Sequence, residues 1–359
     1  MLASTKPTKL AATKLAFNLS TGADTGGAAI REVEAFRSTA GLSSGWQVRS
    51  MVSSSNYIRY PQDLAYSISE LCELYAESDV VHLNHTLAGH SRYDDRQGKP
   101  IVLEHHGLHK DSFVVDFEGS IAQAARAGAV QIASTANLEL FAPPGVIRWV
   151  PISYDLDWLR SIHTQAQRQL VSYPSVLTIA HAPTNRAIKS TEAFIEAMRT
   201  LIGEGLPLRM LLIEHVSHAE CLALKAQADV LVDQLELGYG CNAIEAWGMG
   251  IPVVGGIAHR DWYGHMTQRW GGMPLFEATG ATLTDRLREL ITNPRLREEY
   301  AARGTEHFLV HHTQEHHVQL MKEVYESAKP SVPSASRARG LNHAQRLALL
   351  RENRSRKVV

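Results

Sequence analysis

Short apolar runs alternate with segments of helical periodicity along most of the chain. In the first half, β-strands are predicted at residues 14–20, 47–53, 78–84, 99–107, 128–134 and 145–151. An amphipathic helix is predicted at 28–38, after the glycine-bearing turn 21–27. Strands that alternate with helices build a parallel sheet covered by helices. The first half is therefore predicted to be a Rossmann-like domain.

The same alternation restarts after a polar helical stretch. Strands are predicted at 176–183, 208–215 and 229–234, with helices at 190–205, around 218–228 and from about 281 to 328. The fold class is thus α/β, with two Rossmann-like domains that face a central cleft. We expect domains at 1–165 and 170–315, followed by a tail at 331–359. Ligands of such sheets bind beyond the carboxyl ends of the strands.

Length and composition narrow the possible functions. The chain has 359 residues, a formal net charge of −1, 44% hydrophobic and 20% charged residues. Nearly balanced charge gives no general electrostatic argument for nucleic acid, and no run of eighteen apolar residues could span a bilayer. The first twenty residues lack the continuous apolar core of a secretory signal, so a cytoplasmic protein without a transmembrane segment is expected.

A candidate anion site lies in the segment GYGCNAIEAWGMGIPVV at 238–254. A helix that begins just after Gly240, near Cys241 or Asn242, presents unpaired backbone N–H groups, which can bind phosphate. Glu245 stands near the start of this helix. Its carboxylate could accept hydrogen bonds from ribose hydroxyls, as the acidic residue of dinucleotide folds does. The alternative is that Glu245 only favours the helix dipole.

Two cations follow the predicted strand 176–183. Arg186 and Lys189 precede a helix, in the sequence HAPTNRAIKS. A guanidinium can fork over two phosphate oxygens while an ammonium acts as a point charge, so this pair suits a diphosphate. A solvated loop with ordinary positive charges is the alternative.

Histidines and glycines in other loops are weaker signals. His106 ends a buried strand and could bond a sugar hydroxyl or carry a proton. Gly26 and Gly27 permit close backbone approach, but their loop does not match GxGxxG, which disfavours a nicotinamide cofactor. His307/His311 and His312/His316 have i, i+4 spacing that could hold a metal, but we favour a polar helix surface.

Taken together, these motifs resemble the retaining nucleotide-sugar glycosyltransferases of family 4, which have the two-Rossmann GT-B fold. The resemblance covers roughly residues 14–328. It is carried by TGGAAIREVEAF, SDVVHLNH, KPIVLEHHG, HAPTNRAIKSTEAFIEA and DQLELGYGCNAIEAWGMGIPVV. It also implies that a C-terminal helix at about 316–330 crosses back to complete the first, acceptor-side domain, and that 170–315 binds the donor nucleotide.

The resemblance implies a role for each candidate residue. Arg186 and Lys189 would clamp the donor diphosphate, and Glu245 would bind the ribose. His106 would lie beside the donor sugar and the reacting centre. The donor-binding set would also include the glycine loop and the start of the 241 helix: Gly26, Gly27, Gly240, Cys241, Asn242, Ala243 and Ile244. One position departs from the family pattern, because Leu237 stands where a glutamate usually contacts the donor sugar.

The expected activity is transfer of a sugar from a nucleotide-sugar, with a UDP-sugar favoured, to a hydroxyl acceptor with retention at the anomeric carbon. No cofactor or metal is expected, since protein cations would stabilise the leaving diphosphate and no DxD motif stands at a plausible cleft position. The acceptor is a glycan, lipid or small molecule, or a hydroxymethylated DNA base. The DNA alternative comes from the basic residues of 329–357, which could also contact an anionic surface. A catalytically impaired nucleotide-binding protein that acts through this tail is the alternative function.

Overall fold

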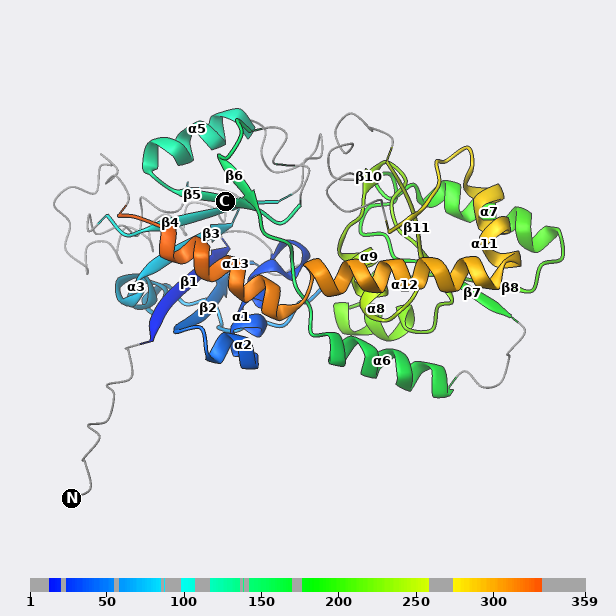
Figure 1. The fold of residues 1–359 in the computed structure, drawn as a ribbon, viewed down its shortest axis with the longest axis horizontal. Coiled ribbons are helices and arrows are strands. Elements are labelled where there is room, and N and C mark those ends of the chain that lie inside the picture. Colours follow the sequence, from blue (N-terminus) through cyan, green and yellow to red (C-terminus); the bar gives the residue numbers. More distant parts are fainter. Residues whose placement is uncertain are drawn as a thin grey trace, which may run out of the picture.

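Two parallel α/β sheets lie in separate lobes of the molecule (Figure 1). The computed structural model describes residues 13–20, 24–54, 58–84, 87, 98–106, 117–135, 138, 142–169, 176–257 and 274–330, so the tail 331–359 lies outside the described residues. The predicted fold class, two Rossmann-like domains, is confirmed. No helix of the described ranges is long and apolar enough to cross a membrane.

The first sheet has the strand order β2-β1-β3-β4-β5-β6, and all its pairings are parallel. Both faces of this sheet are covered, so its strands are largely buried, and β1, β3 and β4 carry polar as well as apolar buried residues. The described strands are β1 (Lys14–Ser20), β2 (Trp46–Val52), β3 (Val80–Asn84), β4 (Ile101–His105), β5 (Val130–Ala133) and β6 (Ile147–Trp149).

Helices surround this sheet. They are the short η1 (Thr25–Gly27) and the α-helices α1 (Ala28–Arg37), α2 (Thr39–Leu42), α3 (Ile68–Glu77) and α5 (Phe117–Ala127). One face of the sheet buries Phe17, Leu83 and Leu103 with residues of α3. On the other face, α1 contributes Ile30 and Phe36 to a second apolar cluster.

The second sheet has the strand order β10-β11-β9-β7-β8, with β12 paired to β11. All its described pairings are parallel except that of β10 with β11. Its strands are β7 (Leu177–His181), β8 (Leu208–Leu212), β9 (Val230–Val232), β10 (Leu237–Gly238), β11 (Val253–Ile257) and β12 (Phe276–Glu277). The helices of this lobe are α6 (Leu156–Gln169), α7 (Thr191–Gly203), α8 (His218–Lys225), α9 (Cys241–Gly248), α11 (Leu283–Thr292) and α12 (Pro294–His311).

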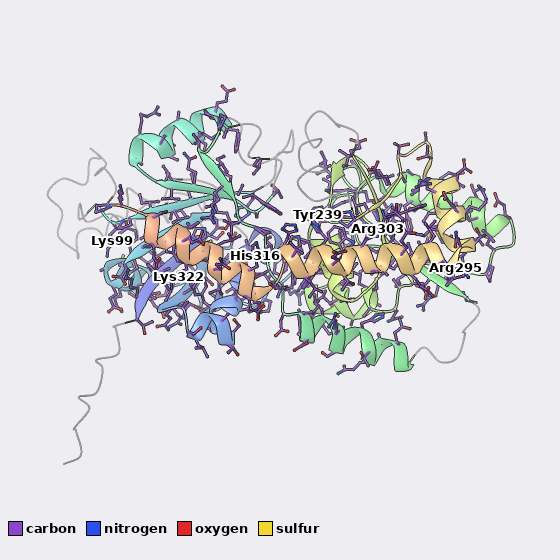
Figure 2. The ribbon with its side chains drawn as sticks, in the orientation of Figure 1. Lys99, Tyr239, Arg295, Arg303, His316 and Lys322 are labelled. Atoms are coloured by element: carbon purple, nitrogen blue, oxygen red, sulfur yellow. The ribbon has the colours of Figure 1, made fainter. Side chains whose placement is uncertain are left out.

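The last described helix returns to the first lobe. Helices α12 and α13 (Gln314–Ser327) follow one another across both lobes, with Arg295 and Arg303 on one side of the junction and His316 and Lys322 on the other (Figure 2). Met321 and Tyr325 of α13 are buried in the same cluster as Ile30 and Phe36 of α1. The two lobes are therefore joined twice, by the chain after β6 and by this helix pair.

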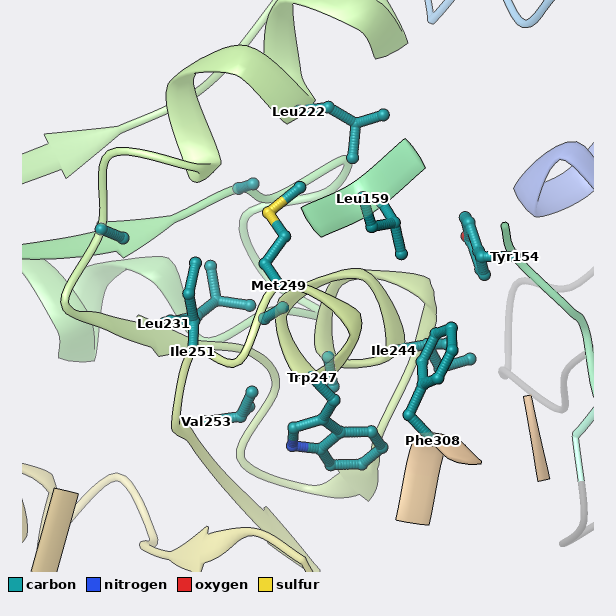
Figure 3. Close-up of a cluster of buried hydrophobic side chains, with 14 of the residues drawn as sticks. Tyr154, Leu159, Leu222, Leu231, Ile244, Trp247, Met249, Ile251, Val253 and Phe308 are labelled. Carbon is teal, nitrogen blue, oxygen red and sulfur yellow. The ribbon is translucent and has the colours of Figure 1, made fainter. Parts of the chain in front are cut away.

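Helix α9 is the centre of the second lobe's core. Its Trp247 is fully buried, and Leu159 of α6 and Phe308 of α12 pack against other parts of the helix (Figure 3). Gly304 allows the close packing of α12, since a Cβ there would lie 2.0 Å from Trp247 Cδ1. This packing fixes where α9 begins, and hence where its first N–H groups point.

The predicted polar surface of the histidine-rich helices is wrong for His307 and His312, which are buried, and the nearby His317 is buried too. At the α12–α13 junction, His312 Nδ1 lies 2.8 Å from the Ile152 carbonyl and its Nε2 lies 3.2 Å from the hydroxyl of Tyr239. Burial lowers the pKa of His312 to about 3. His312 and His317 bond the carbonyls of Ile152 and Pro151 in the connection between lobes, whereas His307 Nε2 lies 3.2 Å from the Tyr239 hydroxyl. The described residues contain no cluster suited to a metal ion.

Candidate functional site

The start of α9 lies where the two lobes meet. Gly240 is its N-cap residue and has no side chain that could cap the helix. From the first lobe, the Gly26 carbonyl lies 3.8 Å from Cys241 Sγ. Gly26 has a φ of 65°, and a Cβ there would come within 2.9 Å of the same sulfur. The structure thus brings the predicted glycine loop against the predicted anion-binding helix start.

Lys189 is fixed beside this helix start by a buried carboxylate. Its Nζ donates to Asp233 Oδ1 at 2.8 Å, and Asp233 Oδ2 accepts from the Gly240 N–H at 2.9 Å. Burial would raise the pKa of Asp233, but the charge and hydrogen bond of Lys189 hold it below its ordinary value. The ammonium lies 3.3 Å from the position that a Cβ on Gly240 would take. Lys189 therefore supplies positive charge next to the first turn of α9.

Arg186 stands on the same loop but has different partners. Its side chain is half exposed, and it forms a bidentate pair with Glu214 at 2.8 and 2.6 Å and a bond to Glu192 at 3.0 Å. The two hydrogen bonds to Glu214 have the fork geometry that a phosphate would also accept. Arg186 and Lys189 both lie between β7 and α7, as the sequence predicted, but each is held by its own carboxylates.

Glu245 is buried in α9 with both carboxylate oxygens bonded. Oε2 pairs with Lys225, and Oε1 accepts from His218 Nε2 at 2.8 Å and from the Tyr154 hydroxyl at 3.0 Å. Burial would raise the pKa of Glu245, but the charge of Lys225 and the bond from His218 lower it. Lys225 is 0% exposed and also donates to Asn242 Oδ1 at 2.7 Å.

Sequence reasoning missed the three partners of Glu245. Tyr154 comes from the connection between lobes, and His218 and Lys225 come from the two ends of α8. A ribose bound by Glu245 would have to share or replace one of these contacts. A lysine within the apolar sequence CLALKAQA was the available signal, since a buried lysine requires a buried acid.

His218 also contacts the first lobe. Its backbone N–H donates to the Ile58 carbonyl at 2.6 Å, and its ring lies 4.6 Å from that of Tyr60. The guanidinium of Arg31, from α1, lies 3.4 Å from both ring nitrogens of His218 and 4.5 Å from the Tyr154 ring centroid. These contacts join the lobes along the same side of α9 that carries Glu245.

His106 lies at the carboxyl end of β4, within the first lobe. It is buried, with Nε2 2.8 Å from Asn84 Oδ1 and Nδ1 3.1 Å from Ser134 Oγ. Burial holds the pKa of His106 below its ordinary value, although the charge of Glu104 acts in the opposite direction. The ring is therefore neutral at physiological pH, and its two nitrogens contact protein groups.

The start of α1 differs from that of α9. Asp24 accepts from the N–H groups of Ala29 at 3.0 Å and Ile30 at 3.2 Å. Burial raises the pKa of Asp24 to about 6. A ligand phosphate at the start of α1 would therefore compete with a carboxylate of the chain itself. At α9, no hydrogen bond of the described residues joins a side chain to the N–H groups of Cys241 or Asn242, and of the N–H groups there Asp233 bonds only that of the preceding Gly240.

A cavity of about 680 Å³ lies beside the connection between lobes, whose Tyr154 and Asp155 line it. Residues of α1 and α2, the start of α6 and the α12–α13 junction line it, including Asp155 and Asp157, which form a DxD sequence. None of the predicted site residues lines this cavity.

Comparisons with known proteins define the class by its fold. No known protein-family description matches the sequence, and no curated protein matches it. Solved structures do match, and they place the chain in the GT-B fold of glycosyltransferases.

Three of the matching structures illustrate the degree of similarity. Sucrose-phosphate synthase from Thermosynechococcus elongatus is 16% identical with a TM-score of 0.56, over 87% of this chain and 98% of that one. Anabaena HepE in complex with UDP-glucose is 12% identical with a TM-score of 0.59, over 87% and 99%. An alpha-glucosyltransferase in complex with UDP and a 13-mer DNA is 9% identical with a TM-score of 0.58, over 88% and 100%.

Proposed function

We propose that the chain is a retaining family 4 glycosyltransferase that moves a sugar from a UDP-sugar to a hydroxyl acceptor. One observation carries the proposal: the uncapped start of α9 faces the Gly26 loop of the other lobe, with Lys189 held beside it by Asp233. Backbone N–H groups, a helix dipole and a fixed ammonium form a site for a diphosphate. The fold shared with a UDP-glucose complex supports the same ligand class.

In the proposed reaction, the bond between the anomeric carbon and the diphosphate oxygen breaks as negative charge grows on the diphosphate. Lys189 and the N–H groups of Cys241 and Asn242 stabilise that charge. Arg186 would join them by exchanging Glu214 for phosphate oxygens, since the same fork geometry serves both. The acceptor oxygen attacks the same face of the sugar, and its proton passes to the departing phosphate.

A donor screen with turnover tests this proposal. UDP-, GDP- and other nucleotide-sugars are incubated with the full chain, and release of nucleotide is followed with and without sugar, lipid and DNA acceptors. Acceptor-dependent release of one nucleotide supports the transferase. The absence of release with every donor, together with tight nucleotide binding, would instead support the impaired binding protein, for which Leu237 at the sugar-contact position is the favouring observation.

A hydroxymethylated DNA base is a second candidate acceptor. The basic residues of 329–357 favour it, because lysine and arginine bind the DNA backbone independently of sequence. If residues 331–359 are removed, DNA retention should fall at low salt while donor binding stays intact. Unchanged DNA retention would contradict the proposal that the tail binds a DNA acceptor.

A further inference from the structure

A row of buried polar side chains runs through the first lobe and ends at His106. On three neighbouring strands every second residue is polar: Asn18 and Ser20 on β1, His82 and Asn84 on β3, Glu104 and His106 along β4 and just after it. Glu32 of α1 and Tyr325 of α13 cover the same face of the sheet. All eight side chains are buried.

A hydrogen-bond chain connects Glu32 to His106. Asn18 Nδ2 bonds Glu32 Oε2, and Asn84 Nδ2 lies 2.6 Å from Asn18 Oδ1. The chain ends where Asn84 Oδ1 lies 2.8 Å from His106 Nε2. Two amide side chains therefore stand between a carboxylate and the imidazole.

The carboxylate fixes the direction of every bond in this chain. An ionised carboxylate only accepts, so the amide of Asn18 must donate to Glu32 and turn its oxygen towards Asn84. Asn84 then donates to Asn18 and turns its own oxygen towards His106. A carbonyl oxygen needs a donor, so the neutral His106 ring carries its proton on Nε2. Its Nδ1 lone pair faces the Ser134 hydroxyl at 3.1 Å and Glu104 Oε1 at 3.7 Å.

Neighbouring groups keep Glu32 ionised. His82 Nδ1 lies 2.9 Å from Glu32 Oε2, its Nε2 lies 3.3 Å from Glu104 Oε2, and Tyr325 donates to Glu32 Oε1. Burial would lower the pKa of His82, but the two carboxylates raise it to about 10. His317 of α13 also acts on Glu32 and Glu104, and Asp24 lies close enough to Glu104 for each charge to affect the other. A positive imidazole between two carboxylates thus compensates the buried charge.

We propose that Glu32 is a positioning residue that fixes the tautomer and orientation of His106 through Asn18 and Asn84. The functional part of this inference rests on the proposed transferase, in which His106 stands beside the donor sugar. Glu32 also bonds Tyr325, so the helix that returns from the second lobe contacts the group that orients His106. The Nε2–H form leaves the unprotonated nitrogen on the Ser134 and Glu104 side.

The tautomer can be read directly by nitrogen NMR of the full chain labelled in histidine. The His106 signals are assigned by their loss in His106→Asn. In the unmodified protein, His106 should show a protonated Nε2 and an unprotonated Nδ1. In Glu32→Gln, residue 32 can donate as well as accept, so Asn18 and Asn84 can reverse and His106 should become a mixture of both tautomers.

The His105 signal and the Tyr325→Phe variant serve as controls. His105 Nε2 lies 2.9 Å from Gln131 Oε1 and takes no part in the hydrogen-bond chain from Glu32 to His106. Its tautomer should therefore not change in Glu32→Gln. Tyr325→Phe removes one donor from Glu32 but keeps the carboxylate, so His106 should keep its single tautomer. A single, unchanged His106 tautomer in Glu32→Gln would overturn the proposal. If that variant does not fold, Asn18→Leu cuts the same chain at its middle and carries the same expectation.

Measurements of kcat and KM distinguish a failure of this inference from a failure of the proposed function. In Glu32→Gln, kcat should fall by up to about a hundredfold with the donor KM unchanged, because His106 is misoriented while the diphosphate site is intact. A tautomer change in a chain that transfers no sugar would contradict the transferase but keep the positioning role. Full kcat in a variant with mixed tautomers would contradict the functional role of the positioning.

Discussion

Asp233 joins two parts of the candidate diphosphate site through its two carboxylate oxygens. Oδ1 accepts from Lys189 Nζ at 2.8 Å and Oδ2 accepts from the Gly240 N–H at 2.9 Å. One buried side chain therefore sets both the position of the cation and the entry of the chain into α9. The lysine and the helix start are held together before a ligand arrives.

Removing this carboxylate should weaken donor binding although both oxygens of Asp233 bond Lys189 and Gly240 rather than the proposed ligand. In Asp233→Asn the amide still bonds one partner, but Lys189 loses its ion pair and its fixed position. We expect the donor KM to rise and kcat/KM to fall by about tenfold or more, measured by nucleotide release. Glu236→Gln, an exposed acid three positions on, is the matched control and should be unaffected. Equal rates in both variants would contradict the positioning by Asp233.

Lys189 should contribute directly to catalysis. Lys189→Ala is expected to lose about 2–4 kcal/mol of transition-state stabilisation, because it removes a charge next to the leaving diphosphate. Arg186→Ala should also lower kcat/KM if Arg186 exchanges Glu214 for phosphate. Lys189→Arg is the conservative comparison and should retain part of the activity. Unmodified rates in both alanine variants would exclude this pair as the diphosphate clamp.

The pair of Glu245 and Lys225 should matter strongly for stability. Glu245→Gln leaves a fully buried ammonium without its charged partner, which typically costs about 3–5 kcal/mol. Urea denaturation measures this free energy of unfolding. The double variant Glu245→Leu with Lys225→Met removes both charges and should be more stable than Glu245→Gln. A double variant that is less stable than Glu245→Gln would contradict the pairing.

The buried charges of the first lobe predict two pH limbs of stability. Burial would raise the pKa of Glu104, but His106 and His82 lower it from 4.5 to about 2. The contribution of Glu104 to the free energy of unfolding is therefore lost as pH falls from about 4.5 towards 2. The pKa of His82 is raised from 6.5 to about 10, so its contribution is complete below pH 6.5 and is lost as pH rises through about 10. Urea denaturation across this range should show both limbs, and Glu104→Gln should reduce both.

Gly26→Ala tests the contact between the lobes. Its Cβ would meet Cys241 Sγ at 2.9 Å, so the lobes should separate and kcat/KM should fall. Gly45→Ala is the matched control, since Gly45 also has a positive φ but no atom lies within 4 Å of its Cβ position. Both variants bear the left-handed backbone cost of about 1–2 kcal/mol. Only Gly26→Ala should lose activity, and adding Cys241→Ala should relieve the clash.

The strands were predictable because their signal is local. The runs 14–20, 47–53 and 176–183 coincide with β1, β2 and β7 to within two residues, since each is an apolar stretch between turn residues. Parallel pairing then brings the carboxyl ends of the strands to one edge. The candidate loops around Lys189 and Gly240 followed from the same rule.

The partners of Glu245 were not predictable because they come from three separate elements. Nothing in the spacing of Tyr154, His218 and Lys225 indicates that they converge on one carboxylate. The polar row at His106 does have a signal in the sequence. In NLS and HLN a polar residue stands on each side of a leucine, and EHH is polar throughout, so all three strands place polar residues two apart on one face of the sheet.

Calorimetry with UDP and UDP-sugars tests the central claim most directly, because it measures binding at the α9 site without requiring the acceptor. The account predicts one site per chain, with affinity lost in Lys189→Ala and kept in Arg303→Ala, an exposed cation on α12. Binding that is unchanged in Lys189→Ala, or no binding of any common nucleotide or nucleotide-sugar, would contradict it.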